Sequence, residues 1–293
     1  MGATSQIPFP VPGHHPATTV AAPCSTQGQR WAGAPSAVLD HDGSVVLAYR
    51  VREERSDHVV LARSADGVAL EPVTEIHPHR LGASMTEKAA LVRLPDRWRA
   101  YVSCATPGGP HWWVGLLEAT RLEDLADAAV RPVLPGDPAT TGLKDPVVHA
   151  TAAGYEAWVC AHDLTVAGEE DRMSTVHATS PDGVTWTVDP RPALAGTPGR
   201  WDARGARVTA VLADGRAAYD GRASAEENWF ERCGLAVPTA DGLVPEPVDP
   251  VADLRYLEVL ALPDGAHRLW YEARRADGAH ELRTELVPAL SPA

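Results

Sequence analysis

Charged residues gather at the start of five short apolar runs in this sequence. Counting back equally from the turn after each run gives one position per run: Ala34, Lys88, Asp145, Ala206 and Tyr256. The ionisable residues that flank these positions are Glu87, Lys144, Asp202, Arg204, Arg207, Arg255 and Glu258. Charges at the ends of buried strands are costly unless they are paired or used. The set therefore predicts either ion pairs between neighbouring elements or a site for acid–base chemistry.

The carboxyl groups of this set are the candidates for catalysis. General acid–base chemistry requires two carboxyls whose surroundings separate their pKa values. Asp145 is the anchoring candidate, with Asp202, Glu87 and Glu258 as its partners. A neighbouring Arg or Lys would hold one carboxyl ionised, and an apolar wall would keep another protonated. Which of them is the acid and which the base stays open.

Other residues are candidates for holding a ligand. Arg204, Lys88 and Arg255 could bind an anionic or hydroxyl-rich group. His162 follows the second run of the Asp145 repeat and could point back toward the same pocket. Trp229 lies beside acids and an Asn, and an aromatic ring there could stack on a sugar face. The alternative for Trp229 is a packing residue at a solvated hairpin tip.

We expect neither a metal nor a cofactor. The His-Pro-His segment at 77–79 and the Cys-Ala-His-Asp segment at 160–163 lack the paired spacing of a structural zinc site. The glycine patterns of nucleotide-binding loops and the Gly-x-Ser-x-Gly elbow are absent from the sequence. The cysteines lie far apart without a Cys-x-x-Cys pair, which favours reduced, packed thiols.

The elements that must position these residues form a repeat. A short apolar run, an Asp/Gly-type turn and a second run ending in an aromatic recur about every 50–60 residues, a spacing typical of repeat architectures. The copies extend from Ala37–Tyr49 to Val259–Tyr271. Asp-Gly turns are typical of β-hairpins because they supply residues with positive φ. A third and a fourth run follow in several copies, which predicts four strands per repeat, as in a propeller blade.

We therefore predict an all-β fold, a five-bladed β-propeller of four-stranded antiparallel blades, rather than a two-sheet sandwich. It should form a single domain, 1–293, with blades near 31–75, 86–135, 143–190, 200–248 and 253–288. The Pro-rich segment Ile7–Pro23 should supply a strand that closes the ring against the fifth blade. Closure matters because an open ring would leave two unpaired sheet edges.

The charge balance limits the partners. The formal net charge is −13, which disfavours binding to nucleic acids and to anionic membranes. No apolar stretch approaches the ~18 residues of a membrane span, and the first residues do not resemble a signal peptide. We expect a soluble, cytoplasmic protein, a monomer or weak homo-oligomer, whose partner is a small molecule or sugar.

The segment Lys144-Asp145-Pro146-Val147-Val148, followed by Tyr155-Glu156-Ala157-Trp158, resembles the inner strand of the five-bladed propeller glycosidases. These are the arabinanase, β-xylosidase and invertase groups, and the nearest is glycoside hydrolase family 43. The resemblance implies three acids on three inner strands, and Asp145 matches the one that orients and tunes the general acid. Ala34 stands where the base is expected. Arg204 stands where the general acid is expected, and arginine cannot donate a proton near neutral pH.

The resemblance and the carboxyl set together predict a glycosidase-like enzyme. It would act on a sugar or a glycosylated small molecule by carboxylate acid–base chemistry in the central channel. One alternative is a non-catalytic propeller that binds a carbohydrate or small molecule, which Ala34 and Arg204 favour. Another is a non-hydrolytic tailoring enzyme on the same scaffold, because the basic channel residues suit an anionic substrate.

Overall fold

The computed structural model describes residues 8–23, 30–53 and 57–289, and its regular structure is almost entirely β. Within these ranges the helical elements are the short 3-10 segments η1 (Pro78–Leu81) and η2 (Leu122–Asp127). No helix of the described residues is long and apolar enough to cross a membrane. The expected all-β class is confirmed.

Antiparallel pairing arranges the strands in groups of four that follow the chain. The first group is β2 (Trp31–Leu39), β3 (Val45–Arg52), β4 (Asp57–Ser64) and β5 (Glu71–Ile76). The second is β6 (Met85–Arg93), β7 (Trp98–Ala105), β8 (Trp112–Ala119) and β9 (Arg131–Leu134). The third is β10 (Thr141–Thr151), β11 (Gly154–Asp163), β12 (Met173–Ser180) and β13 (Thr187–Ala195). The fourth is β14 (Gly205–Val211), β15 (Ala217–Arg222), β16 (Arg232–Thr239) and β17 (Gly242–Pro245). The last is β18 (Arg255–Ala261), β19 (His267–Arg274), β20 (His280–Val287) and β1 (Thr18–Ala21).

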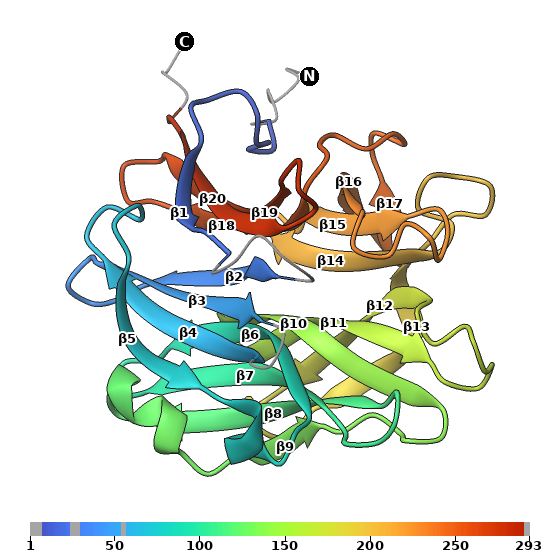
Figure 1. The fold of residues 1–293 in the computed structure, drawn as a ribbon, viewed down its shortest axis with the longest axis horizontal. Helices are drawn as coiled ribbons and strands as arrows, with labels where there is room; N and C mark the ends of the chain where they lie inside the picture. Colours follow the sequence, from blue (N-terminus) through green and yellow to red (C-terminus); the bar gives the residue numbers. More distant parts are fainter. Residues whose placement is uncertain (1–7, 24–29, 54–56, 290–293) are drawn as a thin grey trace.

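The groups follow one another around the molecule, from blue through green and yellow to red in Figure 1. Their first strands contact one another in a closed cycle, in which β2 meets β6, β6 meets β10, β10 meets β14, β14 meets β18, and β18 meets β2. A closed cycle of four-stranded sheets is the geometry of a β-propeller. We propose that each group is one blade of a single five-bladed domain, and we number the blades in that order.

Apolar clusters fill the gaps between neighbouring blades. Val46 and Leu91 share the cluster between blades one and two, and the same arrangement recurs at each further gap around the cycle. Trp270 of blade five, for example, packs with Leu47 of blade one across the point where the cycle closes. Burial of this apolar surface drives the sheets together face to face.

The N-terminal segment pairs with the last strand of the chain. β1 lies antiparallel to β20, with Thr18 opposite Thr284, and so becomes the outermost strand of blade five. The backbone N–H of Gly13 donates to both carboxylate oxygens of Glu285, at 3.0 and 2.9 Å. Glu285 is buried, and Tyr271 donates its hydroxyl to the same carboxylate. These bonds tie the two ends of the described chain together.

A bulge interrupts the inner strand of most blades at one level. Ala34, Asp145 and Tyr256 lie in three of these bulges with φ of 50°, 49° and 51°. Positive φ is uncommon for residues other than glycine, and bulges often re-aim a side chain beside a functional site. Lys88 lies in the corresponding bulge of β6, but β14 shifts register further along than Ala206. Counting back from the turns thus located the bulge of the inner strand in four of the proposed blades.

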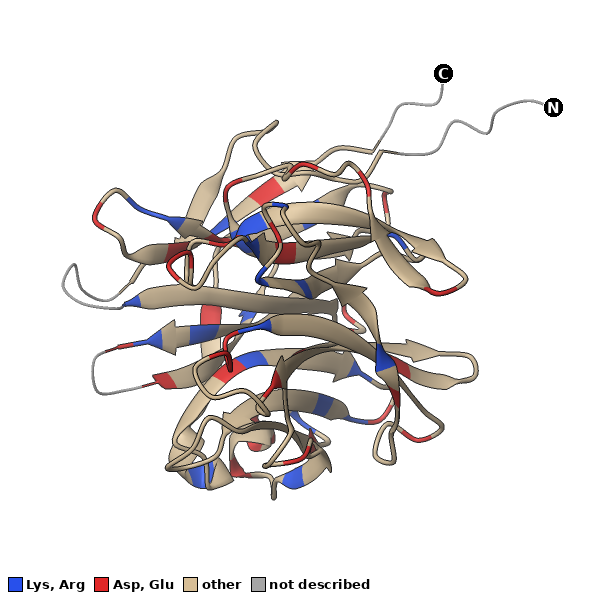
Figure 2. Cartoon of the chain, turned by 90° about the vertical axis from the view of Figure 1, so that its right-hand side faces the viewer, with Lys and Arg blue, Asp and Glu red and all other residues tan. Residues whose placement is uncertain are grey.

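The cysteines are packing residues where the structure describes them. Cys104, Cys160 and Cys233 are buried free thiols, whereas Cys24 lies outside the described residues. Lysines and arginines are interspersed with acids in Figure 2, both on the strands and at the turns.

Candidate functional site

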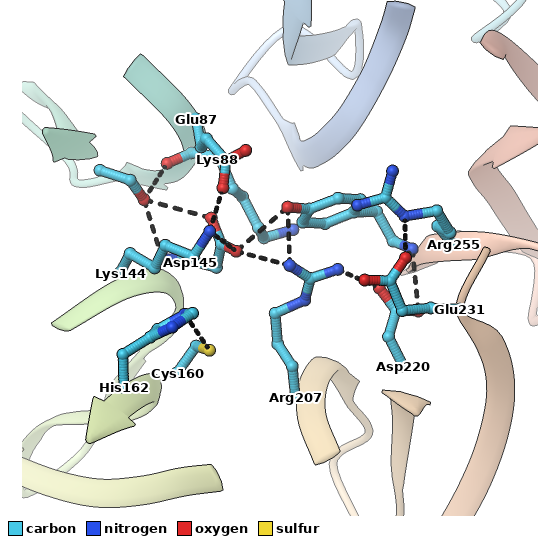
Figure 3. Close-up of polar contacts among 12 residues, drawn as sticks. Glu87, Lys88, Lys144, Asp145, Cys160, His162, Arg207, Asp220, Glu231 and Arg255 are labelled. Carbon is cyan, nitrogen blue, oxygen red and sulfur yellow. Dashed lines mark hydrogen bonds and ion pairs between the residues drawn. The ribbon is translucent and has the colours of Figure 1, made fainter. Parts of the chain in front are cut away.

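A ring of alternating charges lies at the level of the bulges. We call it the charge ring, and its members in order are Arg50, Glu87, Lys144, Asp145, Arg207, Asp220, Arg255 and Glu272. Cations and carboxylates alternate along it. One link is made by backbone, because the N–H of Tyr256, next to Arg255, donates to Asp220 at 3.0 Å. Figure 3 shows most of these contacts.

The charge ring crosses every gap between the proposed blades. Arg50 on β3 donates to Glu87 on β6 and to Glu272 on β19, both at 2.9 Å. Lys144 on β10 pairs with Glu87. Arg207 on β14 donates to Asp145 on β10 at 2.8 Å. Breaking a buried pair by removing one partner typically costs about 3–5 kcal/mol, because an uncompensated charge is left behind. The ring therefore ties the blades together.

A glycine makes room for the ring. A Cβ on Gly33 would lie 2.0 Å from a carboxylate oxygen of Glu272. A Cβ there would force the Glu272 carboxylate to move, so glycine allows Glu272 to approach β2 and meet both Arg50 and Arg255.

One side of the charged layer is sealed, and we call it the closed arc: the ring members Asp145, Arg207 and Asp220, together with Tyr256. Each of these residues is at most 2% exposed. Arg207 donates to Asp145 and Asp220, and its guanidinium lies over the Tyr256 ring, 3.8 Å from the centroid. The Tyr256 hydroxyl donates to Asp145 at 3.1 Å, and the Ser103 hydroxyl accepts from the Asp145 N–H at 2.8 Å. Asp145, the acid on which the resemblance to the propeller glycosidases rests, is therefore hydrogen-bonded through both its backbone N–H and its carboxylate.

Another side of the charged layer is less deeply buried, and we call it the open arc: the ring members Glu87 and Lys144, together with Arg52 and Asp57, which join the ring through the Arg52–Glu87 pair. Their side chains are 8–12% exposed. Burial would raise the pKa of Glu87, but Lys144, Arg50 and Arg52 outweigh it and hold that pKa well below its usual range. Arg52 lies between two carboxyls, with Nε 3.2 Å from Asp57 and Nη2 3.3 Å from Glu87. Glu87 is therefore an ionised carboxylate whose side chain is 8% exposed.

Tryptophans flank the charged layer. Lys144 Nζ lies 4.7 Å from the ring centroid of Trp112, which is half-buried. Trp31 packs against Arg50 and Arg52, and Trp229 lies 5.4 Å from Trp31 between centroids. Trp229 has a φ of 71°, a costly conformation for a bulky residue, and such strain tends to persist at functional sites. Aromatic rings thus lie beside the open arc.

His162 forms a neutral pair with Cys160 beside the ring (Figure 3). Burial, helped by the nearby Lys144 charge, lowers the pKa of His162 to about 4. Burial likewise raises the pKa of Cys160 to about 12. Nδ1 of His162 donates to the carbonyl of Glu170, so Nε2 is left to accept the thiol proton of Cys160. The pair carries no charge at neutral pH.

Two predicted site residues lie at another level of the channel. Lys88 and Glu258 pair at 3.2 Å, and Glu258 also accepts from the N–H of Ala37 at 3.0 Å. They line a cavity of about 180 Å³ with Ser36 and His149. This cavity lies further along the inner strands than the charge ring.

Two other predicted residues make their contacts outside the ring. Asp202 accepts from the Tyr219 hydroxyl and from the N–H of Thr197, each at 3.2 Å. Arg204 donates to Asp171 at 2.6 Å. The structure thus brings together Asp145, Glu87 and Arg255, whereas Asp202, Arg204, Glu258 and Lys88 make their contacts elsewhere.

Sequence reasoning missed the members of the ring that lie on second strands. Arg50, Asp220 and Glu272 each directly follow the aromatic residue that ends the second apolar run of a repeat. A charged residue at that repeat position, embedded in buried sequence, is the signal that would have found them. Among the described residues, no cluster of His, Cys, Asp and Glu could hold a metal ion.

No family model and no curated protein matches this sequence. Solved structures do match its fold. A thermostable family-43 glycoside hydrolase is 13% identical, with a TM-score of 0.68 over 92% of this chain and 97% of that one. A β-1,2-mannobiose phosphorylase from Listeria innocua, solved with β-1,2-mannobiose, is 14% identical, with a TM-score of 0.64 over 94% and 92%.

A third similar structure is described with the family-130 mannoside phosphorylases. That family contains glycoside hydrolases that target β-1,2 mannosidic linkages in Candida mannan. The third structure is 14% identical, with a TM-score of 0.61 over 89% of this chain and 86% of that one. The fold is that of the β-propeller glycosidases and their relatives. The resemblance expected from the sequence is confirmed at this level, and at these identities it establishes the fold alone.

Proposed function

We propose that this protein is a glycosidase-like enzyme that binds a neutral sugar over the open arc and cleaves a glycosidic bond there. The observation that carries the proposal is the state of Glu87. Its side chain is 8% exposed, against 0% for Asp145, and Lys144, Arg50 and Arg52 hold its pKa well below the usual range. Glycosidic cleavage builds positive charge on the anomeric carbon, and an ionised carboxylate stabilises that charge.

A neutral substrate suits the charge balance of the site. Each cation of the charge ring already faces a carboxylate, so an anionic ligand would have to displace one. Arg204 and Lys88, the cations considered for an anionic group, are also paired, with Asp171 and Glu258. Hydroxyl groups can instead share these donors and acceptors without breaking an ion pair. Trp112 and Trp229 supply faces on which a sugar ring can stack.

The test is turnover of a panel of neutral glycosides that includes β-1,2-mannobiose, with and without inorganic phosphate. The similar structures motivate this choice. Products are identified by mass spectrometry, which separates hydrolysis from phosphorolysis and from other reactions. The Glu87→Gln variant should lose at least 100-fold in kcat while it still binds sugar. Glu285→Gln is the control, because Glu285 is also a buried, hydrogen-bonded glutamate but lies on β20, outside the charge ring. Equal losses in both variants would reject the role of Glu87.

A second candidate function is sugar binding without turnover. The observation that favours it is the closed arc, in which the acid that carries the glycosidase resemblance is 0% exposed and bonded to Arg207 and Tyr256. Calorimetric titration separates the two candidates. Saturable sugar binding with no product after prolonged incubation would select the binding protein.

A further inference from the structure

The cavity of about 180 Å³ along the inner strands, which we call the channel cavity, has the features of a second binding site. Its polar lining consists of Ser36, Lys88, His149 and Glu258, and the strands β2, β6, β10 and β18 each contribute to it. The Glu258 side chain is 14% exposed, and His149 is half-buried. These two groups are therefore within reach of a molecule that enters the cavity.

Glu258 is the more accessible of the two charged side chains described in this lining. Lys88 is 1% exposed, and its ammonium donates to the carbonyl of Pro35 and to Glu258. Glu258 Oε1 accepts from the N–H of Ala37 at 3.0 Å, and Oε2 accepts from Lys88 at 3.2 Å. A carboxylate has about four lone-pair sites, so each oxygen can accept from a further donor. The cavity therefore offers a ligand a carboxylate rather than an ammonium.

His149 supplies an acceptor in the same cavity. Burial lowers the pKa of His149, against the opposing charges of Glu258 and Glu156, so the imidazole is neutral at neutral pH. Its ring lies against Trp158 with centroids 5.5 Å apart, and neither ring nitrogen makes a hydrogen bond to a described residue. A neutral imidazole has one acceptor nitrogen. Glu156 lies directly opposite His149 on β11, so two carboxylates make this end of the cavity attractive to a cation.

Apolar side chains form the rest of the channel cavity. They include Val38, Val148, Val259 and Leu260, against which an aliphatic chain can be buried. A cavity of about 150 Å³ is large enough for benzene, so this one fits a ligand of about five or six non-hydrogen atoms. Such a ligand is much smaller than a disaccharide.

We infer that the channel cavity binds a small primary alkylammonium ion. The ammonium donates to Glu258 and to His149, and the alkyl chain packs against the valines and Leu260. A primary amine carries its charge at neutral pH, as the lysine side chain does. Hydrogen bonds from a cation to a carboxylate are roughly twice as strong as neutral ones, which sets the preference for an amine over an alcohol. The site is separate from the open arc, so the inference does not depend on cleavage of a glycoside.

The experiment compares n-butylamine with 1-butanol and butyrate, which are similar in size but differ in charge. Titrations in an amine-free buffer at neutral pH, followed by ligand-observed NMR, give the three affinities. n-Butylamine should bind saturably at one site. 1-Butanol should bind about tenfold more weakly or worse, because it lacks the charge-assisted hydrogen bond, and butyrate should not compete for the site.

Two variants test the proposed contacts. Glu258→Gln should weaken the binding of n-butylamine about tenfold or more and leave that of 1-butanol nearly unchanged. His149→Phe keeps a ring against Trp158 but removes the acceptor, and it should weaken n-butylamine about threefold to tenfold. Glu285→Gln is the matched control, because it makes the same substitution in a buried glutamate of the same proposed blade, outside the cavity. It should bind n-butylamine as the wild type does.

Three results would overturn the inference. They are equal affinities for n-butylamine and 1-butanol, wild-type affinity for the amine in Glu258→Gln, and no binding of the amine up to its solubility limit. Because Glu258→Gln leaves Lys88 without its carboxylate, thermal melting is needed to show that the variant is folded. If it does not fold, His149→Phe decides, and wild-type affinity for n-butylamine in that variant would reject the site.

Discussion

The closed and open arcs are built from the same residue types and differ in what their polar atoms do. In the closed arc both carboxylates are engaged by Arg207, and the Tyr256 ring covers its guanidinium. Each arc keeps one buried polar atom without a hydrogen bond, Asp57 Oδ1 in the open arc and Arg207 Nε in the closed arc. The arcs differ more in exposure, because the side chains of the open arc are 8–12% exposed and the residues of the closed arc at most 2%. From this difference we propose that Asp145, the acid most like a catalytic residue in sequence, belongs to the scaffold.

Removal of Arg207 should break the closed arc most severely. Arg207→Met leaves Asp145 and Asp220 buried without their cation, and the free energy of unfolding should fall by about 3–5 kcal/mol. Urea denaturation measures this. Arg204→Met is the control, because Arg204 pairs with a half-buried aspartate outside the ring and should cost about 1 kcal/mol or less. Similar losses in both would contradict a structural role of the ring.

The two arcs should both make stability fall as the pH rises through mildly acidic values. Asp57 and Asp220 have folded pKa values of about 6 against an ordinary value of 3.8, so the folded state keeps protons that the unfolded state has lost. Their contribution is full below about pH 4 and is lost as the pH rises through 6. Two pKa units correspond to about 2–3 kcal/mol per group.

Asp57→Asn isolates the contribution of the open arc to this pH dependence of the unfolding free energy. The difference in unfolding free energy between the wild type and this variant should fall by about 2 kcal/mol between pH 4 and pH 7. Urea titrations at a series of pH values give this difference, in which the other carboxyls cancel. A difference that does not change with pH would show that Asp57 has an ordinary pKa.

Ser103 tests how tightly the closed arc is held. Its hydroxyl accepts from the Asp145 N–H and donates to the carbonyl of Lys88, both at 2.8 Å. Ser103→Ala leaves these groups buried without partners and should cost about 1–2 kcal/mol, with sugar affinity unchanged. A loss of affinity without a loss of stability would place the ligand against Asp145 instead.

Trp229 should show the smallest effect, and only on binding. Trp229→Ala should weaken sugar binding about tenfold, which is at the upper end of aromatic contacts. Alanine also carries a Cβ, so the unfavourable positive φ remains, and a change in stability would report only the lost contact with Trp31. Isothermal titration with the best ligand of the panel measures the affinity. Unchanged affinity would assign Trp229 to packing against Trp31 alone.

The sequence predicted where along the inner strands the charged residues lie better than it predicted which residues contact one another there. Counting from the turns found Ala34, Asp145 and Tyr256, which share one rare backbone conformation, because the repeat fixes where each inner strand bulges. It could not find which charges pair. Arg50 and Glu272 are separated by 222 positions in the chain, and their contact depends on how blades one and five close. Asp57 lies on the third strand of its blade, where no motif draws attention to it.

A crystal structure with a bound neutral disaccharide tests the central claim most directly. The account predicts the sugar over the open arc, within hydrogen-bond distance of Glu87, Lys144 or Asp57, with the Asp145–Arg207 and Asp145–Tyr256 bonds intact. A sugar bound directly to Asp145 with Arg207 or Tyr256 displaced, or a sugar in the cavity of Lys88 and Glu258, would contradict it.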